Sequence, residues 1–248
     1  MNAIQVLCMR EVKKYLRARA RVLSTLIQPF LVLLALGLGF APIFEKAGEG
    51  NYFVFLVPGV IGSTMLFSAI FSGADLIWDR QFGFLKETLV SPISRYQIMI
   101  GRALGVTFVS LIQGVIVSIV CAVGGFHFPS LTDIVLAGVF GCLTAFMFSM
   151  IGTLLGALIN DTQAFTQVVT IAIGPLFYLS GAVFPLHSQK QFVKNLAAMD
   201  PLTYGVEGIR YALTGQNLFD PWLCIAMLVI LNLVCLAIAT FAFSRLQQ

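Results

Sequence analysis

The sequence predicts an all-α integral membrane protein with six membrane-spanning helices and no catalytic machinery of its own. Two features of the composition favour a lipid environment: 58% of the 248 residues are hydrophobic and only 10% are charged, whereas soluble domains carry about 25% charged residues. The third observation is that the apolar residues fall into six long runs. The whole of 1–248 is therefore predicted to be a single transmembrane domain.

A helix needs about 20 apolar residues to cross a bilayer, and each run is close to that length. The core of each run lacks Asp, Glu, Lys and Arg. A single charged side chain at the centre of a membrane helix costs about 2.5–3.5 kcal/mol. The fifth run is the weakest, because it contains Thr166, Gln167, Thr170 and Pro175. The spans are expected at about 22–44, 52–74, 103–125, 134–158, 165–184 and 222–243.

The lysines and arginines between the spans predict the orientation, because cytoplasmic loops carry an excess of them. One side carries most of these residues and the other carries few. The rich side has Arg10, Lys13, Lys14, Arg17, Arg19, Arg21, Arg80, Lys86, Arg95, Arg102 and Arg245, and the poor side has Lys46, Lys190, Lys194 and Arg210. Both termini are therefore expected to face the cytoplasm.

The segment 1–21 is predicted to form an amphipathic helix. At 100° per residue, one face is apolar and the other is basic. The apolar face holds Ile4, Cys8, Val12, Tyr15 and Leu16, and the basic face holds Arg10, Lys13, Lys14, Arg17 and Arg21. Such a helix is typical of an anionic membrane surface; the alternative is a basic flank of the first span with no further role. The segment does not resemble a secretory signal, because the apolar run that follows is too long.

The first long segment between spans covers 75–102. Pro92 is expected to end any helix at or before Ser91, and Ser94 can cap the helix that continues into the third span. A short helix of about 82–90 remains between them, with Lys86 and Glu87 among its exposed groups. Two interpretations of this segment stay open: a helix that binds a groove on a partner protein, or a solvated loop that lies against the lipid headgroups.

The second long segment, 185–221, is expected on the outer side. Asp200 followed by Pro201 predicts a helix start, and Gly215 predicts its end. A shorter amphipathic helix precedes it, so that 185–215 forms a helical hairpin that dips back into the outer membrane face. Glu207 and Arg210 are expected to form an exposed pair worth about 0.3–0.5 kcal/mol.

The residues that could carry chemistry form no catalytic or metal-binding pattern. The two histidines, His127 and His187, lie in separate loops, and the five cysteines contain no CxxC pair, which favours buried free thiols. Serines and threonines along the second span, such as Ser63 and Thr64, have no histidine nearby and are expected to serve helix packing or a pathway. Gln113, in the third span, is either bonded to a neighbouring helix or a substrate contact.

The glycine pairs Gly101/Gly105 and Gly152/Gly156 have the spacing that lets membrane helices approach closely. The alternative is that the spacing only reflects the 22 glycines of the chain.

Residues 80–95 resemble the cytoplasmic signature of ABC-2 type permeases, the membrane subunits of ATP-driven exporters. That pattern runs roughly R-E-x-G-T-L-E-x-L-L-V-T-P-x-x-R. The matching residues are Arg80, Gly83, Leu85, Leu89, Val90, Pro92 and Arg95, whereas Gln81, Phe84, Lys86 and Thr88 depart from the pattern. A second likeness covers LSGAVFPL (179–186) and DPLTYGVEGIR (200–210), which resemble the fifth span and outer hairpin of the family.

The resemblance implies export of an amphipathic, drug-like or lipid-linked substrate across a bacterial inner membrane. It implies a homodimer of this chain with two copies of a separate ATPase subunit, which would hold ATP and Mg while this chain binds no cofactor and no nucleic acid. The segment that it assigns to ATPase coupling contains Arg80, Phe82, Gly83, Phe84, Leu85, Lys86, Glu87, Leu89, Pro92 and Arg95. The hairpin residues that it singles out are Asp200, Pro201, Tyr204, Glu207 and Arg210; it names no substrate-binding residue.

The residues themselves also favour a separate ATPase. The sequence contains no GxxxxGK[ST] phosphate-binding motif, and no segment outside the spans is long enough for a nucleotide-binding domain. Two other classes stay open. A proton-coupled carrier would need acidic groups or histidines inside the bundle, but Asp75, Asp79 and Asp161 are expected at span ends; a non-transporting scaffold has no contrary feature in the sequence.

Overall fold

The computed structural model describes residues 3–46, 50–84 and 94–245, and within these ranges it contains helices and no strand. Six of the helices are long and apolar enough to cross a membrane, which confirms the predicted fold class. The helices are α1 (Ala3–Arg17), α2 (Arg19–Lys46), α3 (Tyr52–Gln81), α5 (Arg95–Val123), α6 (Leu131–Leu158), α7 (Thr162–Leu179), α8 (Gln191–Met199), α9 (Pro201–Thr214) and α10 (Pro221–Arg245).

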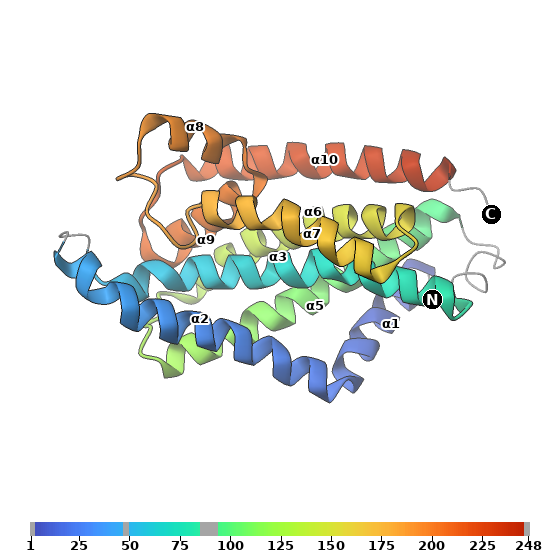
Figure 1. The fold of residues 1–248 in the computed structure, drawn as a ribbon, viewed down its shortest axis with the longest axis horizontal. Coiled ribbons are helices and arrows are strands. Elements are labelled where there is room, and N and C mark those ends of the chain that lie inside the picture. The colour runs from blue at the N-terminus through green and yellow to red at the C-terminus, as the bar shows by residue number, and fades with distance from the viewer. Residues whose placement is uncertain (1–2, 47–49, 85–93, 246–248) are drawn as a thin grey trace.

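The long helices lie side by side around α3, which packs against α2, α5, α6, α7 and α9 (Figure 1). The start of α1 and the end of α10 lie at one end of the bundle, here called the termini end. The short helices α8 and α9 lie at the opposite end, here called the hairpin end (Figure 1). The bundle therefore has two distinct ends, one with the start of α1 and the end of α10 and the other with α8 and α9.

The contact between α3 and α6 depends on glycines with the predicted spacing. A Cβ at Gly152 or Gly156 would collide with the backbone of α3 at Ile70 or Gly73. The two helices thus meet backbone to backbone, as small residues permit in membranes. One turn before this contact on each helix, the large side chains of Leu66 and Phe148 are fully buried. The glycine spacing on α6 therefore marks a packing contact.

Two helices end several residues away from the predicted ends of their spans. Helix α3 continues to Gln81, where the prediction ended the span at residue 74, so Asp75 and Asp79 lie on a helix and not in a loop. Helix α7 ends at Leu179, where the prediction ran to residue 184, because the chain turns at Ser180 and Gly181 has a left-handed φ of 75°. Hydropathy alone predicted neither of these helix ends.

The predicted helix caps are confirmed. Ser94 and Gln97 form a capping box at the start of α5, and the Asp200 carboxylate accepts a hydrogen bond from the Leu202 amide at 2.9 Å at the start of α9. Gly215, with a φ of 70°, ends α9 in the left-handed conformation. Local sequence therefore determines where these helices begin and end.

Candidate functional site: a transmembrane cavity and the charged clusters at its ends

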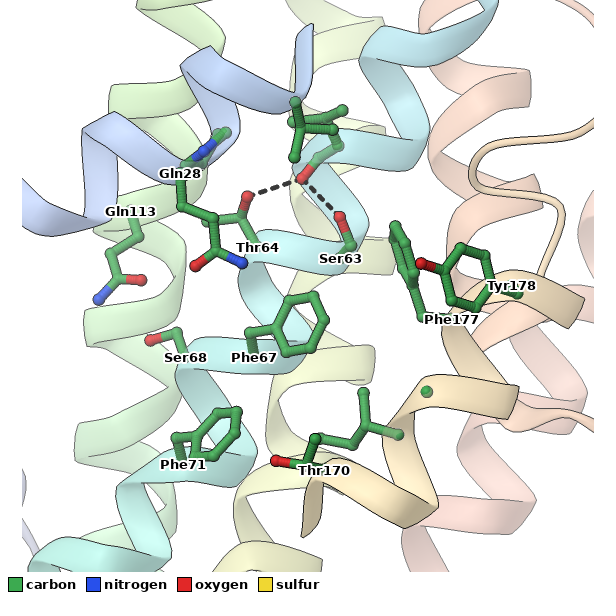
Figure 2. Close-up of a pocket in the computed structure, with 15 residues that line it drawn as sticks. Gln28, Ser63, Thr64, Phe67, Ser68, Phe71, Gln113, Thr170, Phe177 and Tyr178 are labelled. Carbon is green, nitrogen blue, oxygen red and sulfur yellow. Dashed lines mark hydrogen bonds between the residues drawn. The ribbon is translucent and has the colours of Figure 1, made fainter. Parts of the chain in front are cut away.

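A cavity of about 690 Å³ lies between α2, α3, α5 and α7 and is open at the surface beside α7. Figure 2 shows Gln28 of α2 and Gln113 of α5 on one side of it and Phe177 and Tyr178 of α7 on the other, with α3 between them. The two flanking helices α2 and α7 are the least buried of the six candidate spans. Two of the helices that bound the cavity, α2 and α7, are therefore only lightly packed against the rest of the bundle.

The lining of the cavity is amphipathic and neutral. Its aromatic part includes Phe67, whose ring lies 5.8 Å from that of Phe177. The hydroxyls of Ser63 and Thr64 both donate to the Val60 carbonyl (Figure 2), which leaves their oxygens able to accept bonds from a ligand. Of the described residues that line the cavity, none carries a charge.

Gln113 is buried and lines this cavity, which favours the ligand-contact interpretation among the two that the sequence left open. Of the second-span residues that could serve packing or a pathway, Ser63, Thr64 and Ser68 line the cavity, whereas Ser72 does not. Cavities of about 300–1,000 Å³ with apolar walls and a few polar groups are typical of small-molecule sites. The arrangement suits an uncharged or amphipathic molecule better than an ion.

At the termini end, an ionic cluster joins α1, α3 and α5. Asp79 of α3 contacts Arg102 at 2.8 Å, Arg10 at 3.2 Å and Lys14 at 3.6 Å. Arg102 also contacts Glu11 at 3.8 Å. Glu11, Asp79 and Arg102 are each buried. The cluster is therefore an internal network and not a solvated charged face.

This cluster changes the account of the N-terminal helix. Arg10 and Lys14 were placed on a face directed at lipid headgroups, but both contact carboxylates of α3. Of the predicted basic face, Lys13 and Arg17 remain exposed. Arg102, which was counted as a loop charge, is buried in α5. The prediction of an interfacial helix stays a prediction, with a smaller basic face.

The residues assigned to ATPase coupling are only partly described. Arg80 donates hydrogen bonds to the Asn160 side chain and to the Ala157 carbonyl. It therefore supplies a hydrogen-bond donor to a backbone carbonyl at the end of α6. Phe82 and Phe84 are exposed, and Phe84 lies 5.9 Å from the guanidinium of Arg10. Arg95 begins α5. Leu85, Lys86, Glu87, Leu89 and Pro92 lie outside the described residues, so the helix at about 82–90 stays a prediction.

At the hairpin end, the prediction of an exposed Glu207–Arg210 pair is wrong. Both residues lie on α9 and are buried, with exposed fractions of 2% and 4%. Arg210 donates to Glu207 and to the Gly181 carbonyl, and its guanidinium lies 4.2 Å from the Phe55 ring centroid. Glu207 accepts a hydrogen bond from the Leu218 amide at 2.7 Å. The pair is buried because α9 packs against α3, α6 and α10.

Two other hairpin residues are placed by short contacts. Asp200 is buried, and burial raises the pKa of its carboxyl to about 7. The Tyr204 hydroxyl donates to the Ala198 carbonyl at 2.6 Å and so fastens α9 to α8. Pro201 is the first residue of α9. The contacts of these residues therefore join α9 to the segments around it.

Sequence reasoning missed Glu11 and Arg102 as partners. They lie on helices far apart in the sequence, and nothing local signals their contact. One available signal was the Gly101/Gly105 spacing, because α1 packs against this face of α5: a Cβ at Gly105 would lie 2.8 Å from the Glu11 Cβ. A glycine stripe next to a buried arginine predicts that another helix covers that face.

Six apolar helices, four of which bound an amphipathic cavity, define a multi-pass membrane protein. Residues 2–214 match the family described as ABC-2 type transporter, and the chain belongs to this family. It is 31% identical over 230 residues to the transport permease ycf38 of Pyropia yezoensis, with 88% of this chain and 76% of the relative covered.

Two bacterial proteins show the same likeness. The inner membrane transport permease YadH of Escherichia coli (strain K12) is 25% identical over 221 residues, covering 87% of this chain and 84% of YadH. Nodulation protein J of Rhizobium leguminosarum bv. viciae is 26% identical over 231 residues, covering 92% of this chain and 88% of that protein. The similarity therefore extends over most of the transmembrane domain.

Proposed function

We propose that this chain is the permease subunit of an ATP-driven exporter that moves an amphipathic, drug-like or lipid-linked substrate. The carrying observation is the cavity of about 690 Å³, because it is large enough for a drug-sized molecule and offers aromatic rings opposite neutral hydrogen-bonding groups. The described residues that line the cavity carry no charge. Because a buried charge without a partner is costly, the cavity favours substrates whose buried part is uncharged.

The energy source in this proposal is ATP hydrolysed by two copies of a separate ATPase subunit, which hold ATP and Mg. These subunits bind the segment 82–90 at the termini end. Support comes from membership of the family and from the exposed Phe82 and Phe84, which lie at the start of the segment. The termini end then faces the cytoplasm, in line with the excess of Lys and Arg in its segments.

The hairpin end faces outward in this proposal, and α9 re-enters the membrane from that side. The burial of α9 among α3, α6 and α10 supports the re-entry. Phe192 and Met199 of the neighbouring α8 are strongly exposed, as expected for a helix at the lipid interface.

A homodimer completes the pathway in this proposal. Thr166, Gln167 and Thr170 of α7 are exposed on the surface of the chain. An amide such as that of Gln167 is costly to expose to lipid tails, where no water can bond it. A second copy that covers this side of α7 would remove the cost and would close the cavity.

The cavity assignment is tested by filling it. Gly174 lines the cavity, and a Cβ added there has no neighbour within 4 Å, so Gly174→Leu would occupy the space without disturbing the fold. The expected result is loss of amphiphile-stimulated ATP hydrolysis and of transport in vesicles that contain the permease and its ATPase. Gly138→Leu is the matched control, because Gly138 also has open space around it but lies on α6, away from the cavity. Equal activity of the two variants would overturn the assignment.

A further inference from the structure

A buried amide without a partner lies in the wall of the large cavity. Gln113 belongs to the α5 span, lines the cavity and is only 4% exposed. Among the described residues, none forms a hydrogen bond with its side chain, and Figure 2 accordingly shows no dashed line at Gln113. A buried amide that lacks partners costs free energy, and lipid tails cannot supply them. Packing alone therefore does not explain a glutamine at this position.

Two other polar side chains of the spans show how such groups are satisfied when they serve the fold. Thr107 of α5 donates to the Ala103 carbonyl at 2.8 Å, within its own helix. Asn232 of α10 donates to the Leu143 carbonyl of α6 at 3.0 Å and so joins two helices. Gln113 has neither kind of bond within the described part of the chain. Its amide is therefore available to a molecule in the cavity.

Three hydroxyl groups in the cavity are acceptors for a ligand, because their hydrogens are already used. Ser63 and Thr64 donate to the Val60 carbonyl at 3.0 and 2.7 Å. Thr170 donates to the Thr166 carbonyl at 2.7 Å. Since a hydroxyl has one hydrogen and two lone pairs, each of these oxygens can accept a further bond but cannot donate another. The three hydroxyls therefore favour a ligand that donates hydrogen bonds.

Gln113 adds both a donor and an acceptor to these acceptors, because an amide has an NH2 group and a carbonyl oxygen. Gln28 of α2 and Ser68 of α3 line the same cavity, and neither has a hydrogen bond to another described residue. A hydroxyl group of a ligand both donates and accepts, so it can bond the amides and the acceptor hydroxyls alike. An ether oxygen of a ligand can only accept and leaves the acceptors of the cavity without partners.

The aromatic side chains of the cavity suit the apolar body of such a ligand. The ring centroids of Phe67 and Phe177 lie 5.8 Å apart, and those of Phe67 and Phe71 lie 6.4 Å apart. In Figure 2, Phe177 and Tyr178 lie across the cavity from Gln113. The described lining residues include no charged group, so an ionic head would lack a counter-ion. The cavity therefore matches an amphiphile whose head is neutral and carries hydroxyl groups.

We propose that Gln113 is a specificity-determining residue whose amide bonds a hydroxyl group on the neutral head of an amphipathic ligand. Ser63 and Thr64 accept hydrogen bonds from further hydroxyls of the same head. This inference rests on the proposed function, because it names the substrate class of the cavity described there. Glycerol ethers and alkyl glycosides share the chemistry that is recognised, namely neighbouring hydroxyl groups on an uncharged head.

The test compares two ligands that differ only in their hydroxyl groups: dodecyl glycerol ether, and the same molecule with both hydroxyls capped as methyl ethers. Binding is measured on the purified permease in lipid nanodiscs without any ATPase, so the result does not depend on transport. The five cysteines are replaced, and Tyr178→Cys serves as the reporter, because Tyr178 is exposed and lines the cavity. Its rate of labelling by a maleimide should fall as ligand occupies the cavity, which gives the affinity of each ligand.

The reporter chain should bind the ligand with free hydroxyls about tenfold more tightly than the capped ligand, since single hydrogen bonds change affinity by factors of a few. Gln113→Met keeps the length of the side chain without its polar groups and should reduce the preference to about threefold, as should Thr64→Val. Both variants should bind the capped ligand as the reporter chain does, which shows that the cavity is intact. Gln163→Met is the matched control, because Gln163 is exposed on α7 and does not line the cavity.

The outcomes separate the recognition of hydroxyls from the function that it serves. If the reporter chain binds neither ligand, or if Gly174→Leu leaves binding unchanged, the cavity is not a substrate site and the proposed function fails as well. If both ligands bind equally, or if Gln113→Met keeps the tenfold preference, only the role of Gln113 is overturned. With Gln113-dependent binding in hand, dodecyl glucoside distinguishes the two sources: the head that binds more tightly, glycerol or sugar, is the one that the cavity recognises.

Discussion

At the scale of single residues, the most consequential group is the buried pair Glu207–Arg210, which contacts three other parts of the chain. Arg210 contacts the turn after α7 and the Phe55 ring of α3, while Glu207 bonds the segment before α10. Removal of one partner from such a pair leaves an uncompensated buried charge, which costs about 3–5 kcal/mol. The pair therefore holds the hairpin end together only while both charges are present.

Glu207→Gln is accordingly expected to lower the melting temperature of the detergent-solubilised protein strongly, because the amide can still accept from Leu218 but no longer neutralises Arg210. The double variant Glu207→Gln with Arg210→Met should recover part of the loss, since it leaves no charge unpaired. Thermal unfolding of the single and double variants measures both effects, with the exposed Glu45→Gln as control. A single variant as stable as the control would contradict the account.

A second residue-scale prediction concerns pH. Burial raises the pKa of Asp200 to about 7, whereas an aspartate in an unfolded chain titrates near pH 4. Between these values the folded protein holds a proton that the unfolded chain has released, so stability should decrease as pH rises from about 4 to about 7 and then level off. Asp200→Asn keeps an oxygen that can accept from the Leu202 amide but cannot ionise.

The variant should therefore remove that part of the pH dependence, which melting curves of both proteins between pH 4 and 8 would measure. Parallel curves for the parent chain and the variant would show that Asp200 is not the titrating group.

Residue contacts were the part of the structure that the sequence predicted least well. Composition placed Arg102 among the loop charges and left Glu11 without a role, because a contact between helices far apart in sequence has no local pattern. The pair Glu207–Arg210 was placed correctly three residues apart on one helix, but its burial depends on α3, α6 and α10 packing around α9. The sequence shows which residues are charged, but it does not show whether each charge is buried or exposed in the fold.

At the scale of elements, the sequence was a better guide, because helices in a membrane are dictated by local hydropathy and by caps. The runs of apolar residues identified six spans, and Ser94, Asp200 and Gly215 marked the ends of helices correctly. The clearest miss is the length of α3. Its last turns contain Asp75, Asp79 and Arg80, which look like a loop by hydropathy but are stabilised by partners on α1, α5 and α6.

The turn that ends α3 gives the element-scale prediction. Gly83 has a φ of 82°, and its amide donates to the Arg80 carbonyl at 3.2 Å. Proline cannot adopt that φ and has no amide hydrogen, so Gly83→Pro should redirect the segment that follows while the bundle stays folded. We expect the variant to lose ATPase binding and stimulated ATP hydrolysis, measured by co-purification and phosphate release.

Gly125→Pro is a matched control at the other end of the bundle. Gly125 has a φ of 98°, and its amide donates to the Ala122 carbonyl at 3.0 Å, so the backbone disturbance is similar but distant from the segment. Retained coupling in Gly83→Pro, or equal loss in both variants, would argue against contact of the ATPase with 82–90.

At the scale of the whole molecule, the two ends of the bundle are built differently around one cavity. The hairpin end is fastened by the buried pair of α9 and by the Tyr52 hydroxyl, which donates to the Val183 carbonyl at 3.1 Å. The termini end is joined by an ionic network that leaves a small cavity beside it. Alternating access in a transporter needs the two ends to open at different times, and rigid-body shifts of helices are the usual means. The poorly buried α2 is the part best suited to move.

The proposed homodimer can be tested at the same scale by cross-linking. In a two-fold symmetric interface, a residue near the axis meets its own copy, and the exposed polar side of α7 is the surface that lipid would cover least favourably. In a chain whose five cysteines are replaced, Gln167→Cys should therefore form a covalent dimer on oxidation in the membrane. Ile238→Cys is the control, because Ile238 is an apolar and exposed residue of α10 that is well suited to lipid. Oxidised membranes separated on a denaturing gel give the dimer fraction, and a yield at Gln167→Cys no higher than at Ile238→Cys would place the interface elsewhere.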